Sequence, residues 1–398
     1  MKKMRKISFF AGMLRAGLAV HGAVVLVVML CGCATTTECP AKSPSCQAAA
    51  ALPPLKVGVY ADRGPGGIGA VEWFRLVHES PEMELKLLDG KMVREGALDG
   101  LDLLVMPGGS SMTEFDTLGT NGVERMKAFV RNGGGYVGTC AGCCLLMDGP
   151  KKRARMMPWN STGSEGNTMF PTFRLNAKGA AALGLKEGQH VMRYHGGPFL
   201  WPTTNAIADA HMEIWGTFDS EATFKGRLNQ NKKMYGAGAI VGGTYGKGRV
   251  FVTSAHPEYF NGTLYIVEAA LKYVTGRTIT FPPRMRKPGS ISVGFLAKGI
   301  GGVETAETAI ALADEKDFDL TLIDMDGIAQ RRLDHIDVLV LTNNGAKKNE
   351  KLAKAIREFA ANGGKVVGYG GGAEVLPPGG VKCPSRDGVV KAVRELFK

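Results

Sequence analysis

Three patterns that would place this chain in a special class are missing from its sequence. The 55 glycines among 398 residues follow no Gly-X-Y period, which excludes a collagen-like triple helix. No G-x-x-x-x-G-K loop occurs, which excludes a P-loop nucleotide site. No zinc-finger spacing, basic helix or stacked-aromatic motif accompanies the net charge of +12, so the usual grounds for nucleic-acid binding are absent.

The composition that remains is that of a globular protein. Hydrophobic residues make up 44% of the chain and charged residues 22%, a balance that excludes wholesale disorder. The length allows two or three domains. Because glycine is unusually common without a repeat, we expect it to mark turns, helix ends and close backbone approaches.

The N-terminus lacks acidic residues, since none occurs before Glu38. Five basic residues precede an apolar run over 16–30, the pattern of a secretory signal. The run ends in Leu-Cys-Gly followed by Cys33, which resembles a bacterial lipobox and implies lipidation of Cys33 and removal of residues 1–32. Ala34 resembles the outer-membrane sorting pattern, so we expect a membrane-anchored lipoprotein of the cell envelope. An uncleaved anchor and a buried helix are the alternatives.

Residues 33–54 are rich in Thr, Ala and Pro and show no helical or strand period, which predicts a tether. Cys39 and Cys46 lie within it and either form a disulfide in an oxidising compartment or have no role. Loss of the signal removes five basic residues and no acidic one, so the net charge falls from +12 to +7. That excess predicts solvation and no nucleic-acid partner.

Short apolar strands alternate with helical segments from Leu55 onward. We expect strands at LKVGVY, ELKLLDG, LDLLVMPGG and GYVGT, and helices near 70–79 and over VERMKAFVRN. In the second helix Val123, Met126 and Phe129 share one face, and Gly133 provides the stop. The alternation predicts an α/β protein with a flavodoxin-like, doubly wound parallel sheet.

The same series of segments returns near residue 291. SVGFLAKGIGG resembles KVGVYADRGPGG, IDVLVLTNNG resembles LDLLVMPGG, and IREFAANGGKVVGYGGG resembles KAFVRNGGGYVGTCAG. These matches predict an internal duplication, with domains over 55–280 and 291–398 and a linker over 281–290. Two unrelated doubly wound units are the alternative. The second copy is truncated, and Gly370 stands where the first has Cys140.

Cys140 is the centre of a G-x-C-x-G sequence between an apolar strand and an apolar helical segment. This is the form of a nucleophile elbow, in which the strand turns sharply into a helix and leaves the central side chain exposed. The helix N-terminus favours a thiolate, and the backbone N–H that follows can stabilise a developing oxyanion. Gly108 or Gly109, at the end of the neighbouring strand, is expected to provide a second donor.

A base and an orienting acid for this thiol occur together in RVFVTSAHPEYF. A strand over 249–253 leads into His256-Pro257-Glu258, where His256 can accept the Cys140 proton and Glu258 can fix its tautomer. The alternative is a polar loop histidine beside a helix N-terminal acid. An isolated H-x-E is weak, but together with the elbow and the glycine pair it predicts a Cys-His-Glu triad.

The segments VMPGG, GGGYVGTCAG, YHGGP and SAHPE resemble the class I glutamine amidotransferase-like superfamily, and more narrowly the N-terminal domain of some biotin–protein ligases. The resemblance covers roughly residues 55–275 and implies a flavodoxin-like fold with Cys140, His256 and Glu258 as the triad. No biotin-ligase catalytic domain follows, and no synthetase accompanies the chain to receive ammonia. The resemblance also implies oxyanion or substrate-binding roles for seven residues: Gly108, Gly109, Ala141, Tyr194, His195, Gly196 and Gly197.

Other interpretations of Cys140 stay open at this level. It can be a buried structural thiol, or one half of a C-x-x-C pair with Cys143 that serves redox chemistry or regulation. Metal binding by the three triad residues lacks a visible fourth ligand, and we predict no metal and no cofactor. Cys144 is expected in the core.

Three further features have two interpretations each. His195 either contacts substrate or shapes a turn with its Gly-Gly-Pro. The glycine-rich segment at 64–69 predicts a tight turn rather than a phosphate cradle, because its spacing is not the dinucleotide fingerprint and Asp62 would repel phosphate. The basic run at 151–155 predicts a solvated loop, with an anionic substrate group as the alternative.

Together these features predict an exported, lipid-anchored cysteine hydrolase or amidase that acts on a small-molecule or peptide amide, or a related carbonyl. Two other functions are consistent with the sequence. One is a non-catalytic envelope binding or scaffold lipoprotein, which the absence of a nucleophile in the second copy suggests. The other is a thiol redox protein that uses Cys140 and Cys143.

Overall fold

The computed structural model describes residues 52–150, 152–161, 163–164, 166, 168–220, 234–297, 302–324, 332–343, 347 and 349–398. The predicted signal, Cys33, Cys39, Cys46 and most of the tether lie outside the described residues. Residues Leu52–Lys398 form one compact unit. Within the described ranges, no helix has both the length and the apolar character needed to cross a membrane.

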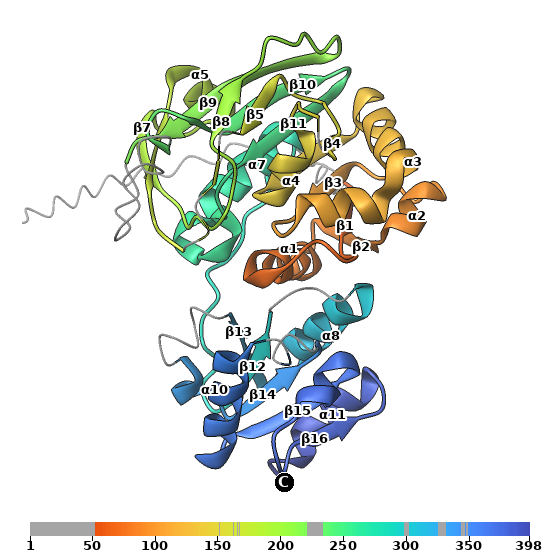
Figure 1. Ribbon diagram of the computed structural model, residues 1–398, viewed down its shortest axis with the longest axis vertical. Coiled ribbons are helices and arrows are strands. Elements are labelled where there is room, and N and C mark those ends of the chain that lie inside the picture. Colours follow the sequence, from red (N-terminus) through yellow and green to blue (C-terminus); the bar gives the residue numbers. More distant parts are fainter. Residues whose placement is uncertain are drawn as a thin grey trace, which may run out of the picture. The chain divides into compact units, whose positions relative to one another are not determined.

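The larger sheet begins as a parallel, doubly wound sheet (Figure 1). Its parallel strands run in the order β2-β1-β3-β4-β11, which is the flavodoxin-like order. The predicted α/β class with a flavodoxin-like parallel sheet is therefore confirmed. The bounds of these strands are β1 Leu55–Tyr60, β2 Met83–Leu88, β3 Leu103–Met106, β4 Gly135–Thr139 and β11 Gly248–Thr253.

An antiparallel extension continues this sheet beyond β11, in the order β10-β9-β6-β7, and β5 and β8 pair beside it. It carries the YHGGP segment, between β7 and β8. The bounds are β5 Trp159–Ser161, β6 Thr172–Leu175, β7 Gly188–Val191, β8 Leu200–Pro202, β9 Ala210–Phe218 and β10 Gly238–Tyr245.

The central strands are apolar because helices cover both faces of a parallel sheet. All four residues of β3 and all five of β4 are buried. The registers Met106↔Gly138 and Thr253↔Thr139 bring the carboxyl ends of β3, β4 and β11 to the same level. The segments that follow these three strands, with the glycine pair, Cys140 and His256, therefore meet at one edge of the sheet.

The helices that flank this sheet differ in how far they are buried. Residues 68–74 of α1 are all buried, whereas only one face of α3 is buried. The helix expected over VERMKAFVRN begins earlier, at Ser111, and contains a non-helical residue, Gly119, at φ 63°. The helix bounds are α1 Gly67–Glu79, α2 Gly90–Arg94, α3 Ser111–Arg131, α4 Ala141–Leu146, α5 Ala177–Leu183 and α7 Leu264–Thr275.

A second sheet, of five parallel strands in the described residues, has the order β13-β12-β14-β15-β16. This is again the flavodoxin-like order, and Val293↔Val338 corresponds to Val57↔Leu103 in the first sheet. Because unrelated doubly wound proteins share this order, the duplication and the truncated copy stay predictions. The bounds are β12 Ile291–Leu296, β13 Phe318–Ile323, β14 Val338–Leu341, β15 Lys365–Tyr369, β16 Val381–Cys383, α8 Val303–Asp314, α10 Glu350–Ala361 and α11 Asp387–Glu395.

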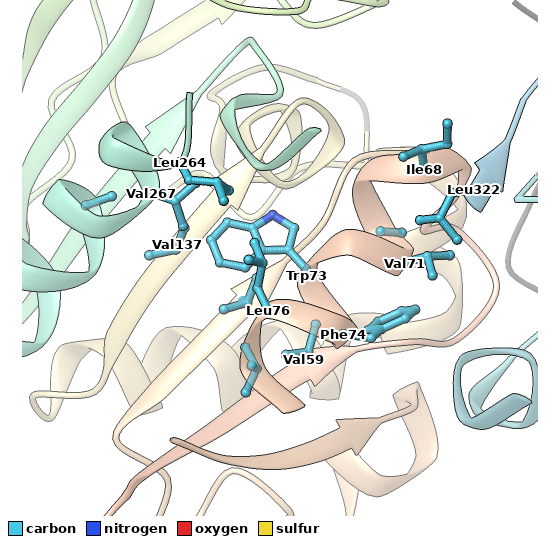
Figure 2. Close-up of a cluster of buried hydrophobic side chains, with 14 of the residues drawn as sticks. Val59, Ile68, Val71, Trp73, Phe74, Leu76, Val137, Leu264, Val267 and Leu322 are labelled. Carbon is cyan, nitrogen blue, oxygen red and sulfur yellow. The ribbon is translucent and has the colours of Figure 1, made fainter. Parts of the chain in front are cut away.

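Helix α1 packs against both sheets, which explains why it is buried all round. Figure 2 shows Leu322 of β13 close to Ile68 and Val71 of α1, while Trp73 points toward Val137 and Leu264. One buried hydrophobic cluster contains residues of both sheets. The core of the compact unit is therefore continuous across the predicted domain boundary.

The segment predicted as a linker, 281–290, is fixed to the larger sheet's helices. Arg284 forms ion pairs with Glu72 and Glu79 of α1, the latter with 2.9 Å between Nε and Oε2. The backbone N–H of Phe281 donates to Glu268 of α7 (2.7 Å). These contacts make the linker part of the packed structure.

Candidate active site

Cys140 lies at the turn between β4 and α4 with a positive φ of 49° and ψ of −97°. Positive φ is rare for a residue with a Cβ and marks a strained position. The flanking glycines allow the turn, because a Cβ on Gly142 would lie 2.1 Å from the carbonyl oxygen of Met106 and one on Gly138 would lie 2.8 Å from Gly142. The backbone N–H of Cys140 donates to Thr253 (2.8 Å). The predicted elbow geometry is present.

The structure brings the three predicted triad residues together. Nδ1 of His256 lies 2.9 Å from Oε1 of Glu258, and both side chains are buried. Gly108 lies beside the imidazole and the thiol: a Cβ there would be 2.5 Å from Cε1 of His256 and 3.3 Å from Cβ of Cys140. Since Nδ1 is held by Glu258, Nε2 is the ring nitrogen left for Cys140.

The electrostatics of this group favour a protonated imidazole. Burial alone would lower the pKa of His256, but the Glu258 carboxylate and the neighbouring Cys140 raise that pKa to about 10. The three side chains therefore have the spatial order thiol, imidazole and carboxylate.

Glu258 is supported by residues that the sequence analysis did not identify. Thr139 donates to its Oε1 (3.3 Å), and Trp73 donates in turn to Thr139 (3.4 Å between Nε1 and Oγ1). Gly69, in the first turn of α1, lies against the same carboxylate, because a Cβ there would be 2.3 Å from Oε1. No sequence signal indicated this contact, because the sequence predicted Gly69 in a turn before the helix, whereas α1 begins at Gly67.

The predicted oxyanion donors lie beside Cys140. Ala141 is the first residue of α4, where N–H groups have no partner within the helix. Gly108 and Gly109 follow β3, and Gly109 has a φ of 153°. A Cβ on Gly109 would lie 2.0 Å from the carbonyl oxygen of Gly64, so the turn at 64–66 packs on this pair, and the rest of the turn predicted at 64–69 belongs to α1. Their role toward an oxyanion stays a prediction.

The YHGGP segment is only partly placed as expected. His195 is exposed; its carbonyl oxygen accepts from the Cys140 thiol (3.4 Å), and its Nδ1 lies 3.0 Å from Oγ1 of Thr168. Gly196 has a φ of 74°. The Tyr194 side chain is fully buried among Phe199 and Phe218, so it does not line a pocket and that expectation is wrong.

Gly197 also has a packing role. A Cβ there would lie 1.9 Å from the carbonyl oxygen of Ser254, two residues before His256. Its own carbonyl oxygen accepts from the Tyr194 hydroxyl (2.6 Å). Gly197 therefore keeps the YHGGP segment close to the His256 loop.

The neighbouring cysteines are thiols rather than a disulfide. Cys140, Cys143, Cys144 and Cys383 are all free. Burial raises the pKa of Cys143 well above its usual range and that of Cys144 to about 12. A fully buried thiol with a raised pKa is a poor partner for exchange, which weighs against the redox interpretation. In the part of the chain that the structure describes, no cluster of three His, Cys, Asp or Glu residues suits a metal ion.

A second buried acid, Glu114, lies on α3, which packs against α4, the helix that follows Cys140. Its side chain is fully buried, and neither carboxylate oxygen has a hydrogen-bond partner among the described residues. Burial raises the pKa of Glu114 to about 8, although Arg153 lowers it. The carboxyl group is therefore mostly neutral at pH 7. Arg153 also donates to Ser111 (3.1 Å), so this residue of the predicted solvated run packs against α3.

Comparison with protein families matches one of them, described as "Biotin-protein ligase, N terminal". The match covers residues 84–145. Residues 84–145 resemble the biotin-protein ligase N-terminal domain. The matched segment contains β3, the glycine pair, β4 and Cys140, whereas His256 and Glu258 lie beyond it. The predicted resemblance is thus confirmed over the segment that contains the glycine pair and Cys140.

Similar solved structures have low sequence identity to this chain. A protein from Thermoplasma acidophilum described as a GMP synthase subunit is 15% identical, with a TM-score of 0.37, over 55% of this chain and 93% of its own. A ThuA-like protein from Bacteroides uniformis is 11% identical, with a TM-score of 0.42, over 58% and 96%. PurLQS from Thermotoga maritima is 12% identical, with a TM-score of 0.39, over 55% and 99%. A search of curated proteins found no match.

Proposed function

We propose that this chain is a cysteine-dependent hydrolase that cleaves an amide or a related carbonyl compound. The observation that carries the proposal is Cys140 at a strained elbow, beside an imidazole whose Nδ1 is held 2.9 Å from Glu258. A buried structural thiol has no need of strain, a histidine and a buried carboxylate at once. The supporting contacts from Thr139 and Gly69 fit a carboxylate that must be held in place.

In the proposed reaction the Cys140 thiolate attacks the carbonyl carbon, and the oxyanion forms beside the N–H groups of Gly109 and Ala141. The intermediate collapses when Nε2 of His256 gives its proton to the leaving amine, which leaves a thioester on Cys140. Nε2 then removes a proton from water as the water oxygen attacks the thioester. The carboxylic acid leaves with the second proton of the water, and Cys140 is released as a thiolate. The first proton stays on Nε2 of His256, so the thiolate–imidazolium pair is restored. Glu258 keeps the imidazole oriented throughout.

The test compares Cys140 with Cys383, which is equally buried (5% and 4% exposed) and lies in the second sheet. Peptide mass spectrometry after iodoacetamide treatment from pH 5 to 9 measures both thiols in one sample. We expect Cys140 to react roughly 10–100 times faster near pH 6, because its thiolate is stabilised. His256→Ala is expected to abolish that difference, whereas Cys383→Ser leaves Cys140 unchanged.

Turnover separates hydrolysis from binding. Amine release from a panel of amides and short peptides is expected with the wild type and to be lost in Cys140→Ser. Equal reactivity of the two thiols, unaffected by His256→Ala, together with no turnover, would support a binding or scaffold role instead. Full turnover in Cys143→Ala would make a redox role unnecessary.

We also propose that the chain is an exported lipoprotein attached to the membrane through Cys33. The lipobox-like end of the apolar run supports this. Radiolabelled palmitate should be incorporated by the wild type and not by Cys33→Ala. Cys46→Ala is the control, because it changes a cysteine of the predicted tether and should retain the label.

A further inference from the structure

The second sheet sends one acidic side chain to the loops that carry the triad. Asp324 follows the carboxyl end of β13 directly. Its Oδ2 accepts from the hydroxyl of Tyr259 (2.6 Å) and lies 3.3 Å from Nη2 of Arg193. The Arg193 and Asp324 side chains are 8% and 16% exposed, so this ion pair is nearly buried.

Arg193 and Tyr259 belong to segments that hold the His–Glu pair. Tyr259 follows Glu258 in the short 3₁₀ helix Pro257–Tyr259. The carbonyl oxygen of Arg193 accepts from the backbone N–H of His256 (2.8 Å), an isolated bridge between two loops. The Arg193 guanidinium also stacks on the Tyr259 ring, 3.9 Å from its centroid. Asp324, Arg193 and Tyr259 thus form one group, which we call the clamp.

The clamp continues toward the thiol on its other side. Arg193 donates to Thr168 (3.3 Å), and Thr168 lies 3.0 Å from the His195 imidazole. The carbonyl oxygen of His195 accepts from Cys140. Contacts that hold Arg193 in place therefore hold the whole segment 193–195. This segment contacts His256 through the Arg193 backbone and Cys140 through the His195 backbone.

The region where the two sheets meet is not completely filled by side chains. A cavity of about 650 Å³ lies between α1, the 3₁₀ helix and β13, and Glu258, Tyr259 and Arg284 are among its lining residues. On the cavity side the loop that carries Glu258 has fewer packing neighbours, whereas on its other side Gly69 packs against the carboxylate. The nearly buried ion pair adds a directed contact to that packing.

We propose that Asp324 is a positioning residue for the triad, so that the sheet without a nucleophile completes the site of the sheet that has one. Asp324 acts through Arg193 and Tyr259 and touches no reacting atom. The inference rests on the proposed function, because it assigns a role to a residue that acts through His256 and Glu258. The second sheet, which has Gly370 rather than a cysteine at the turn after β15, would then contribute to the site through Asp324.

The experiment uses full-length Asp324→Asn, Asp324→Glu and the control Asp319→Asn. Asp319 lies on the same strand, and its partner Arg286 is largely exposed. We expect Asp324→Asn to lower the Cys140 alkylation rate near pH 6 by roughly 10-fold, since small displacements of catalytic groups are costly. Asp324→Glu should recover part of the rate, and Asp319→Asn should match the wild type.

Two further measurements separate positioning from a general loss of stability. A double-mutant cycle of Asp324→Ala with Tyr259→Phe should be strongly non-additive in the alkylation rate, because both remove the same contact. NMR titration of His256 should show a lower apparent pKa in Asp324→Asn than in Asp319→Asn. An unchanged titration and alkylation profile in folded Asp324→Asn would overturn the inference.

The same data distinguish this inference from the proposed function. If Cys140 in the wild type reacts no faster than Cys383, the proposed function fails. In that case a shifted His256 titration in Asp324→Asn would still support positioning by the clamp. If Cys140 is reactive and Asp324→Asn leaves both readouts unchanged, the proposed function stands and the clamp has no positioning role.

Discussion

Gly69 is the residue where a single added carbon would test the geometry of the triad most directly. Alanine in a helix interior usually stabilises a protein by about 1 kcal/mol relative to glycine. Here the new Cβ would lie 2.3 Å from Oε1 of Glu258 and 2.9 Å from Nδ1 of His256. We therefore expect Gly69→Ala to displace the carboxylate and to lower Cys140 alkylation by roughly 10-fold.

Gly262→Ala is the matched control for this prediction. No atom lies within 4 Å of the position a Cβ would take at Gly262, and its φ is ordinary. Its alkylation rate should equal that of the wild type. A Gly69→Ala protein that is more stable and fully reactive would show that the carboxylate does not depend on this contact.

Glu114 makes stability depend on pH in the direction opposite to most acids. Its pKa in the folded chain is about 8, above the 4.5 of an ordinary glutamate side chain, so the folded state binds the extra proton between these two pH values. Its favourable contribution is complete below about pH 4.5 and is lost as pH rises through 8. We expect Glu114→Gln to be more stable than the wild type at pH 8, by on the order of a few kcal/mol.

Thermal unfolding at pH 5, 6.5 and 8 measures this effect. The difference in Tm between Glu114→Gln and the wild type should grow with pH. Glu124→Gln, on the same helix but largely exposed, should follow the wild-type curve. Parallel curves for Glu114→Gln and the wild type would contradict the assigned burial cost.

The sequence was sufficient to predict that Cys140, His256 and Glu258 lie close together, because each follows a strand end, and parallel strands bring their carboxyl ends to one edge. It was insufficient for Gly69, Thr139 and Asp324. Their roles come from contacts between segments far apart in the chain, which local patterns do not encode. Tyr194 was misplaced for a related reason, since a motif gives proximity but not the direction of a side chain.

At the level of elements, the segment 281–290 shows how a linker becomes structural. The Arg284 side chain is 25% exposed, and its partner Glu72 is 11% exposed. Arg75 also pairs with Glu72 and Glu79, so removal of Arg284 leaves these acids partly compensated and costs about 2 kcal/mol. We expect Arg284→Ala to lower the free energy of unfolding by about that amount, as measured by urea denaturation.

Arg286→Ala is the control, because its side chain is 68% exposed. Exposed ion pairs contribute about 0–1 kcal/mol, so its effect should be small. Equal effects of the two substitutions would mean that Arg284 adds no more than a surface pair.

The sequence predicted that helix α1 exists, but it did not predict that α1 packs against two sheets. Its apolar residues suit a helix, yet residues 68–74 are buried on every side. A helix of this kind needs two packing partners, and the sequence pattern identifies only one sheet. The second partner, Leu322 of β13, became evident only in the three-dimensional structure (Figure 2).

At the scale of the whole molecule, the shared core predicts that residues 52–398 unfold together. Leu322 is 5% exposed, and it packs with α1 in the cluster that spans both sheets. Differential scanning calorimetry should therefore give one transition, with equal calorimetric and van't Hoff enthalpies. Leu322→Ala should shift that single transition to lower temperature, since such truncations cost about 2–5 kcal/mol. Two separated transitions would show independent domains.

The two elbows of the molecule allow one last conclusion. Cys140 has a φ of 49° and Gly370, at the equivalent place after β15, has a φ of 54°. The sharp bend is thus a property of the strand-to-helix crossing and does not require a thiol. Glycine occupies it without strain, whereas cysteine does so at a cost of about 1–3 kcal/mol. The fold forms this bend after β4 and after β15, and only the bend after β4 carries a side chain that makes it strained.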